Sequence, residues 1–270
     1  MTTRMFKYPR TRHIEGSRCQ PGDEDLESER FAVLKDCHVV VEEKVDGANA
    51  GISFDRDGTL KLQSRGHYLT GGAREKHFTL FKQWAQTYAV DFFERVGDRY
   101  IIFGEWLYAK HTMFYNQLPH YFMEFDIFDT ETSTFLDTPS RAELLKGLPI
   151  FSVRVLHSGR IRTHAELTGM IGPSAFISEG HLDELKSACV SRGLNVDRAM
   201  KETDPETTME GLYIKVERDG IVAERYKYVR ASFLTAVTQA DGHWLSRAII
   251  PNRLRSAPAI PKATSNDDTE

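Results

Sequence analysis

Residues 41–49, V-E-E-K-V-D-G-A-N, decide how the rest of this sequence is interpreted. An apolar run that begins at Val39 passes into two glutamates and a single lysine, Lys44, and an Asp-Gly pair follows. A charged turn on a surface has this composition, because Asp and Gly are common turn residues. A lysine nucleophile at the end of a strand has it too. The other charged segments of the chain must therefore decide between the two interpretations.

Length and composition indicate an ordinary soluble protein. The chain has 270 residues, with 40% hydrophobic and 27% charged residues and a net charge of −4. This charge excludes a surface that is basic throughout, but it allows a local basic groove for nucleic acid. The sequence contains no run of 18 apolar residues, so no membrane span is expected. The N-terminus lacks the apolar core of a signal peptide. The three cysteines are scattered without metal or disulfide spacing, so we expect a reduced, cytoplasmic protein.

Most of the chain has the pattern of strands joined in hairpins. D-R-D-G at 55–58 and R-D-G at 218–220 are hairpin signals. Strands are expected at 39–44, 50–54, 59–65, 100–107, 121–129, 153–157, 211–217 and 222–229. Helices are expected at 75–96, at 140–147 with Ser140 as N-cap, within 164–201, and at 230–239. Strands in hairpins, without regular β-α-β units, predict an α+β fold with mainly antiparallel sheets.

Five further charged islands interrupt these apolar strands. Each has an ordinary explanation: Glu105 could be an edge-strand acid, and Lys215 and Lys227 could face solvent on a hairpin. Together, their order and spacing favour one functional site. The islands are S-R-G at 64–66, F-G-E-W-L-Y at 103–108, E-F-D-I-F-D at 124–129, E-G-L-Y-I-K at 210–215 and R-Y-K at 225–227.

The order of the islands resembles the covalent nucleotidyltransferase superfamily, which contains nucleic-acid ligases and mRNA capping enzymes. The resemblance covers residues 39–230. K-V-D-G at Lys44 looks like the motif of the nucleotide-accepting lysine, and E-G-L-Y-I-K matches E-G-x-x-x-K. R-Y-K stands where the last motif supplies phosphate-binding lysines, although Arg225 departs from lysine at its first position.

Two details are similar to the ATP-dependent RNA ligase family, the type-2 phage enzyme and its relatives. Asn49 ends the lysine motif, where DNA ligases usually have arginine. F-G-E-W-L-Y-A-K-H-T-M-F-Y at 103–115 also looks like the third motif of RNA ligase-like proteins. The resemblance implies a nucleotidyltransferase fold with flanking helices.

The resemblance implies a role for each island residue. Lys44 would carry AMP, and its pKa must fall from about 10.4 for its amine to attack phosphorus. We expect burial and the cations Lys215 and Lys227 to lower it, and we expect the same two lysines to meet the negative charge at the α-phosphate, with Arg65 and Arg225 supporting. The nucleotide would also contact Glu43, Arg65, Glu105, Phe125 and Arg225, with Glu105 at the ribose hydroxyls and Phe125 on the adenine. Glu210, and less strongly Asp46, would bind metal, Asn49 would lie near the reacting ends, and Asp126 would belong to the site.

The implied activity is ATP-dependent sealing of RNA through a lysyl-AMP intermediate. ATP and Mg²⁺ or Mn²⁺ are the implied cofactors, and RNA 5′-phosphate ends or nicks are the implied partner. We expect residues 1–240 to form this domain and 241–270 a tail with a disordered Pro- and Ser-rich end. No OB-fold domain is expected, so a helper subunit is possible. Three alternatives stay open: a minimal DNA ligase, a GTP-using capping-type enzyme, and a nucleotide-binding accessory module.

Overall fold

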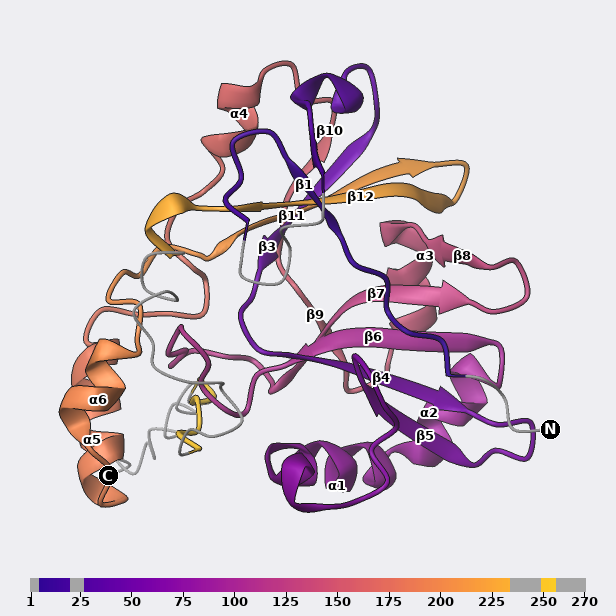
Figure 1. The fold of residues 1–270 in the computed structure, drawn as a ribbon. Coiled ribbons are helices and arrows are strands. Elements are labelled where there is room, and N and C mark those ends of the chain that lie inside the picture. Colours follow the sequence, from indigo (N-terminus) through magenta and orange to yellow (C-terminus); the bar gives the residue numbers. More distant parts are fainter. Residues whose placement is uncertain (1–4, 20–26, 234–248, 256–270) are drawn as a thin grey trace, which may run out of the picture.

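The computed structural model describes residues 5–19, 27–233 and 249–255, and its elements are shown in Figure 1. The helical elements are η1 (Phe31–Leu34), η2 (Ala73–Phe78), α1 (Thr79–Thr87), α2 (Ala89–Val96), α3 (Thr138–Leu145), α4 (His164–Thr168), α5 (His181–Ser191) and α6 (Val196–Lys201). The strands are β1 (Arg12–Ile14), β2 (Ser28–Glu29), β3 (Val39–Lys44), β4 (Ala48–Phe54), β5 (Leu60–Ser64), β6 (Tyr100–Trp106), β7 (Phe122–Asp129), β8 (Thr134–Leu136), β9 (Phe151–Ser152), β10 (Val155–Gly159), β11 (Gly211–Arg218) and β12 (Ile221–Val229).

All of these strands belong to one 12-stranded sheet. Its main path has the order β10-β3-β11-β12-β8-β7-β6-β4-β5, and every neighbouring pair along it is antiparallel. Each parallel pair among the described strands includes one of the short strands β1, β2 and β9, which lie off this path. The prediction of an α+β fold with a mainly antiparallel sheet is confirmed.

The sheet divides into two halves that contact each other across their inner faces. The upper half contains β10, β3, β11 and β12, and the lower half contains β7, β6, β4 and β5; β8 joins them (Figure 1). Lys215 of β11 forms an ion pair with Asp126 of β7, so the inner faces meet. Charged residues of the two inner faces therefore come together.

Each half buries its outer face against helices. In the lower half, Ile52, Ile102 and Phe122 pack with Phe81 of α1 and Phe92 of α2. In the upper half, a second cluster joins β3, β11 and β12 to η1 and α4. Side chains alternate between the two faces of a strand, so these apolar residues leave their polar neighbours on the inner faces.

The predicted helix at 75–96 is three shorter elements. The chain departs from helical geometry at Phe78 and Tyr88, where ψ is close to zero, and each break separates one element from the next. The N-cap of α3 is Asp137 instead of Ser140. The Asp137 side chain accepts a hydrogen bond from the backbone N–H of Ser140 at 3.0 Å, so the helix begins two residues earlier than expected.

Of the predicted strand at 153–157, residues 155–157 belong to β10, while residues 153–154 lie between β9 and β10. Of the helix expected at 230–239, residues 231–233 are helical and the remainder lies outside the described residues, as does the expected disordered end. Residues 249–255, assigned to a tail, pair with the body of the protein. Pro251 bridges to Ala109 and Leu254 to Leu118.

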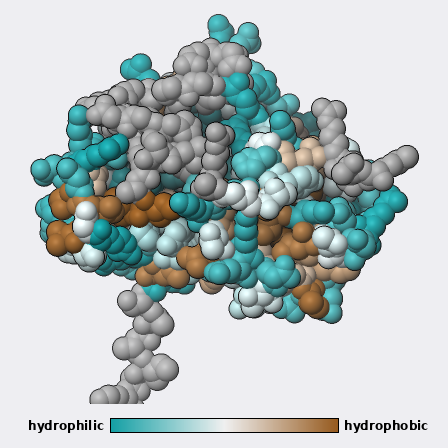
Figure 2. Space-filling model, turned by 60° about the horizontal axis from the view of Figure 1, so that its bottom comes forward, coloured by the Kyte–Doolittle hydropathy of each residue, from teal (hydrophilic) through white to brown (hydrophobic). Residues whose placement is uncertain are grey.

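The surface carries scattered apolar side chains. Figure 2 shows a face on which apolar groups alternate with hydrophilic ones. Exposed apolar residues lie on different elements, including Leu80 on α1, Val90 on α2 and Val190 on α5. Among the helices of the described residues, none has the length and apolar character needed to span a bilayer.

Candidate active site

The site is centred on Lys44, the last residue of β3, and on the buried Glu210. Lys44 lies opposite Gly211 in the β3–β11 ladder, and Glu210 immediately precedes β11. This register brings Lys44 Nζ to 2.7 Å from Glu210 Oε1. The Lys44 side chain is 24% exposed and that of Glu210 is 1% exposed. The amine is therefore accessible, while its carboxylate partner is not.

Gly47, in the K-V-D-G turn, lets this turn lie directly against β6. A β-carbon at this position would lie 2.7 Å from the Trp106 carbonyl oxygen and 3.0 Å from the Glu105 Cγ. The Gly47 N–H instead donates a hydrogen bond to Glu105 Oε1 at 3.0 Å. The glycine thus brings Lys44 of the upper half close to Glu105 of the lower half.

Gly211 has a comparable role in the E-G-L-Y-I-K segment. A β-carbon there would lie only 1.9 Å from the Tyr228 carbonyl oxygen of β12. No side chain fits such a separation from backbone, so this position requires glycine for steric reasons. Gly211 therefore allows β11 to lie close to β12 in the row that also pairs with Lys44 of β3.

The three acidic residues around Lys44 perturb one another. Burial raises the pKa of Glu105 to about 8, and Glu210 and Asp46 add to the rise, although Lys44 offsets part of it. Burial likewise raises the pKa of Glu210 to about 7, with Lys44 and Lys227 acting in the opposite direction. Carboxyl groups that hold protons at neutral pH in this way are frequent at functional sites.

The pKa of Lys44 is raised, contrary to the expectation that it would be lowered. Burial acts to lower it, but the negative charges of Glu210, Glu105 and Asp46 outweigh burial. The expected cation Lys215 lies opposite Val40, four residues along the ladder from the Lys44 row, or roughly 13 Å. In this structure acids, not cations, dominate the surroundings of the amine.

The acidic residues fit a divalent cation. Glu210 and Glu105 offer hard oxygen donors, and a divalent cation beside them would offset the burial that raises their pKa values. Asp46 is already engaged, because its Oδ2 accepts backbone hydrogen bonds from Thr112 at 2.7 Å and Met113 at 3.0 Å. No group of three or more metal-ligating side chains is preformed in the part of the chain that the structure describes. Glu210 is therefore the strongest candidate ligand.

Asn49 and Arg65 lie at the same end of the lower half as Glu105. Asn49 of β4 is paired with Glu105 of β6. Its Oδ1 is buried and has no hydrogen-bond partner among the described residues. Arg65 follows Ser64, the last residue of β5, and is exposed. Asn49 thus lies in the row of Glu105, and Arg65 lies at the same end of the sheet and is open to solvent.

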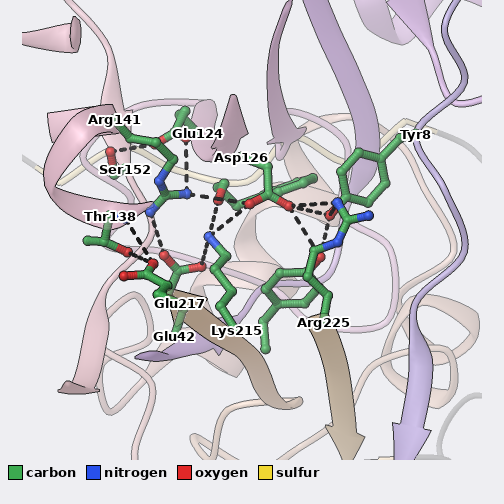
Figure 3. Close-up of polar contacts among 12 residues, drawn as sticks. Tyr8, Glu42, Glu124, Asp126, Thr138, Arg141, Ser152, Lys215, Glu217 and Arg225 are labelled. Carbon is green, nitrogen blue, oxygen red and sulfur yellow. Dashed lines mark hydrogen bonds and ion pairs between the residues drawn. The ribbon is translucent and has the colours of Figure 1, made fainter. Parts of the chain in front are cut away.

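Lys215 and Asp126 belong to a buried ion network instead of an open phosphate site (Figure 3). Lys215 Nζ lies 2.8 Å from Glu42 and 3.1 Å from Asp126, and all three side chains are completely buried. The Lys215 ammonium group also donates to the Phe125 carbonyl oxygen. These contacts balance the charge of the ammonium group and occupy its hydrogen-bond donors. The expected role of Lys215 at a phosphate therefore does not agree with its position.

Arg225 joins the same network. Its guanidinium lies 3.5 Å from Asp126 Oδ2 and stacks over the Phe135 ring at 3.7 Å, and its side chain is 16% exposed. Lys227, two residues further along β12 and on the same face, is half-buried and lowers the pKa of Glu210. Of the three expected phosphate cations on β11 and β12, Lys227 is therefore the one that acts electrostatically on the Lys44–Glu210 pair.

Phe125 and Glu43 differ in how well they can contact a nucleotide. The Phe125 ring is partly buried at the inner faces, with its centroid 5.2 Å from that of Tyr8 and 5.9 Å from that of Tyr213. The Glu43 carboxylate lies on the side of β3 opposite Lys44, where it accepts a hydrogen bond from Ser174 at 2.5 Å. Only the Glu43 backbone is therefore available on the side of the site.

Sequence reasoning missed the residues that complete the ion network. Arg141 of α3 lies 2.7 Å from Glu42 and 3.1 Å from Glu124. Tyr8, near the N-terminus, donates to Asp126 at 2.5 Å. The pattern of α3, T-P-S-R-A-E-L-L, contains no signal that its arginine is buried. Only the run of acids in apolar strands, Glu42 and Glu124 among them, could have indicated a need for buried cations.

Comparison with known proteins gives a family match for the sequence and similar folds among solved structures. The RNA ligase family model matches residues 37–229, well over half of the chain. A mutant of the Naegleria gruberi RNA ligase, solved with ATP and Mn, has a similar fold, with a TM-score of 0.53 and 16% identity over 87% of this chain and 59% of that one. The same organism's RNA ligase with PPi gives a TM-score of 0.51 and 18% identity over 87% and 58%. This chain thus spans less than two thirds of these proteins, and no curated protein matches it.

Proposed function

The chain belongs to the RNA ligase family, and on that premise we propose that it is an ATP-dependent RNA ligase that works through a covalent lysyl-AMP intermediate. The observation that carries the proposal is the pairing of Lys44 with Glu210 at 2.7 Å, with Glu105 across the inner faces. It places a partly exposed lysine amine beside a buried carboxylate that can accept its proton and can bind a divalent cation. Both structural neighbours are RNA ligases, one with ATP and Mn and one with PPi.

In the first step, the neutral amine of Lys44 attacks the α-phosphorus of ATP. A phosphorus–nitrogen bond forms, the bond to the bridging oxygen breaks, and pyrophosphate leaves. The amine must first lose a proton, and Glu210 Oε1 lies within hydrogen-bond distance of it. A divalent cation at Glu210 would supply positive charge that lowers the pKa of Lys44 and meets the phosphate oxygens.

The other residues of the site would hold the nucleotide. Lys227 is the candidate for the negative charge that develops on the α-phosphate, because it already acts electrostatically at Glu210. Glu105 would accept hydrogen bonds from the ribose hydroxyls, and Phe125 would stack on the adenine. Arg65 is exposed beside them and available to phosphates. Lys215 and Arg225 would support the site through the buried network.

In the second and third steps, AMP would pass to a 5′-phosphate end, and a 3′-hydroxyl would then displace it. The phosphorus–nitrogen bond breaks as the pyrophosphate linkage to the end forms, which returns Lys44 to its free state. Asn49 would act in these steps, since its unpaired Oδ1 lies in the row of Glu105. RNA is the proposed substrate.

Incubation with ATP labelled at the α-phosphate tests the first step. We expect label to remain on the denatured protein and peptide mapping to find it on Lys44. Lys44→Arg should abolish labelling, because guanidinium stays protonated and cannot attack phosphorus. Lys61→Arg is the matched control, since Lys61 is a partly exposed lysine paired with Asp55. Label on another lysine, or labelling by GTP and not by ATP, would contradict the proposal.

A gel assay of labelled 5′-phosphate strands tests sealing. Single-stranded and nicked RNA are compared with matching DNA at low and high salt, because phosphate contacts weaken steeply with salt. We expect joining of RNA ends at low salt, and Asn49→Ala should reduce joining more than Lys44 labelling. Efficient sealing of DNA alone would identify a DNA ligase instead. Labelled protein that never activates an end would indicate that the acceptor requires a partner subunit.

A further inference from the structure

Residues 249–255 pair with the loop that follows β6 and carries residues 107–118. The backbone N–H of Lys110 donates to Ile250 at 2.8 Å, and that of Arg253 donates to Tyr115 at 2.9 Å. The Leu118 N–H donates in turn to Arg253 at 3.1 Å. These bonds extend along the whole loop, so the segment holds a loop that lies more than 130 residues earlier in the chain.

Asn252 is the centre of this contact. Its side chain is 1% exposed, and its amide spans the loop: Oδ1 accepts from the Tyr115 N–H at 2.9 Å, and Nδ2 donates to the Leu107 carbonyl at 2.8 Å. Its backbone adds a bond to the Tyr108 carbonyl at 2.8 Å and accepts one from the Tyr121 hydroxyl at 3.0 Å. One donor and one acceptor at fixed positions suit an amide and no other side chain of this size.

The loop that Asn252 holds fixes Asp46, two residues after Lys44. The Asp46 N–H donates to the Tyr115 hydroxyl at 2.8 Å. The Asp46 carboxylate accepts from the backbone N–H groups of Thr112 and Met113 at 2.7 and 3.0 Å. Tyr115 thus binds Asn252 through its backbone and Asp46 through its side chain. Both ends of this relay are buried or nearly so.

We propose that Asn252 is a positioning residue for Lys44: it holds Tyr115 and the 107–118 loop, and through them Asp46, so that the Lys44 amine stays aligned with Glu210. This inference rests on the proposed function for its catalytic consequence. Its structural part, the control of Lys44 by a distant residue, is independent of that function. Asn252 touches no reacting atom, and a misplacement of about 1 Å in such a site is enough for a loss of about 10²-fold.

The test compares Asn252→Leu and Asn252→Asp with Arg253→Ala. Leucine has a similar shape and neither hydrogen-bonding group, and aspartate keeps the acceptor for Tyr115 and loses the donor to Leu107. Arg253 is the matched control from the same segment, because its side chain contacts Glu184 of α5 instead of the loop. We expect Asn252→Leu to slow single-turnover labelling of Lys44 by roughly 10- to 100-fold. The ATP concentration for half-maximal rate should change far less, and Arg253→Ala should behave as wild type.

A second readout separates this inference from the proposed function. The pH-dependent reactivity of the Lys44 amine with acetic anhydride, mapped by mass spectrometry, needs no ATP. We expect the Asn252 variants to shift it and Arg253→Ala not to. If wild type is never labelled by ATP, the proposed function fails and this readout alone decides the positioning role.

Tyr115→Phe removes only the hydroxyl that accepts a hydrogen bond from the Asp46 N–H. It is the variant that tests the inference if Asn252→Leu does not fold. Combined with Asn252→Asp, it should give less than the sum of the two separate effects, because both act through one relay. A folded Asn252→Leu protein with wild-type labelling rate and wild-type Lys44 reactivity overturns the inference. Additive effects of Asn252→Asp and Tyr115→Phe overturn it as well.

Discussion

Replacement of Arg141 by methionine should destabilise the protein strongly, because it removes one of three cations from a buried, balanced cluster. Arg141 has a side chain that is 3% exposed, and it faces Glu42 at 2.7 Å and Glu124 at 3.1 Å, both completely buried (Figure 3). Lys215 and Arg225 are the other cations, and Asp126 is the third acid. Methionine keeps the approximate volume and leaves three carboxylates against two cations.

Loss of one partner from a buried ion pair costs about 3–5 kcal/mol, a large part of a total stability of about 5–15 kcal/mol. The cost should depend on pH. Burial raises the pKa of Glu124, and the positive charge of Arg141 offsets part of this rise in the wild-type protein. Without Arg141 the pKa rises further, and a folded-state pKa above the unfolded value means that the native state binds more protons. The free energy of unfolding of the variant should therefore fall, relative to wild type, as pH increases from about 5 to 8.

Equilibrium urea unfolding at pH 5.5 and 8 measures this difference. Lys146→Met is the control: Lys146 follows the same helix, and its pair with Glu143 is three-quarters exposed on both sides, so its loss should cost less than about 1 kcal/mol. Adding Glu42→Gln to Arg141→Met should recover part of the loss, since it restores the charge balance. A change below about 1 kcal/mol for Arg141→Met at pH 8 would refute the view that the cluster is held by compensated buried charge.

Three further predictions concern the site itself. Glu210→Gln should slow labelling of Lys44 by about 10²–10³-fold, measured by single-turnover kinetics, and a near-wild-type rate would exclude Glu210 from the reaction. The affinity for Mn²⁺ should increase as pH rises from 6 to 8.5, and binding should release protons, because the pKa of its candidate ligand Glu210 is raised to about 7. Calorimetry in buffers of different ionisation enthalpy detects this release, and a pH-independent affinity would contradict it. Gly211→Ala should lower the thermal midpoint and abolish labelling, because its β-carbon would lie 1.9 Å from a backbone oxygen; a folded, active variant would show that the strands can separate there.

The centre of the site could be predicted because its signals are local. Lys44 ends an apolar strand and Glu210 immediately precedes one, and each is next to or near a glycine that the structure requires at a close backbone approach. Strand alternation and the hairpin signals were enough to give the antiparallel sheet. The pairing of β3 with β11 follows from neither, and it alone brings Lys44 to Glu210.

Arg141 and Asn252 could not be predicted because their surroundings come from distant parts of the chain. Arg141 lies in a short helix whose sequence is polar on several sides, and only the packing of α3 against the sheet buries it. Asn252 follows a proline in a stretch with no periodicity, and its partners precede it by more than 130 residues. Such residues leave no pattern in a single sequence, since their burial depends on tertiary contacts alone.

The contrast between Lys44 and Lys215 shows why residue type and motif do not fix a role. Both side chains point to the inner face of the upper half, four rows apart in the same ladder. Lys215 is completely buried between Glu42 and Asp126, so its ammonium balances charge and ties β11 to β7. Lys44 lies where the two halves end, and its amine is 24% exposed. Glu42, on the same face of β3 and two residues before Lys44, connects the two environments, so the buried cluster holds the strand that presents the reactive amine.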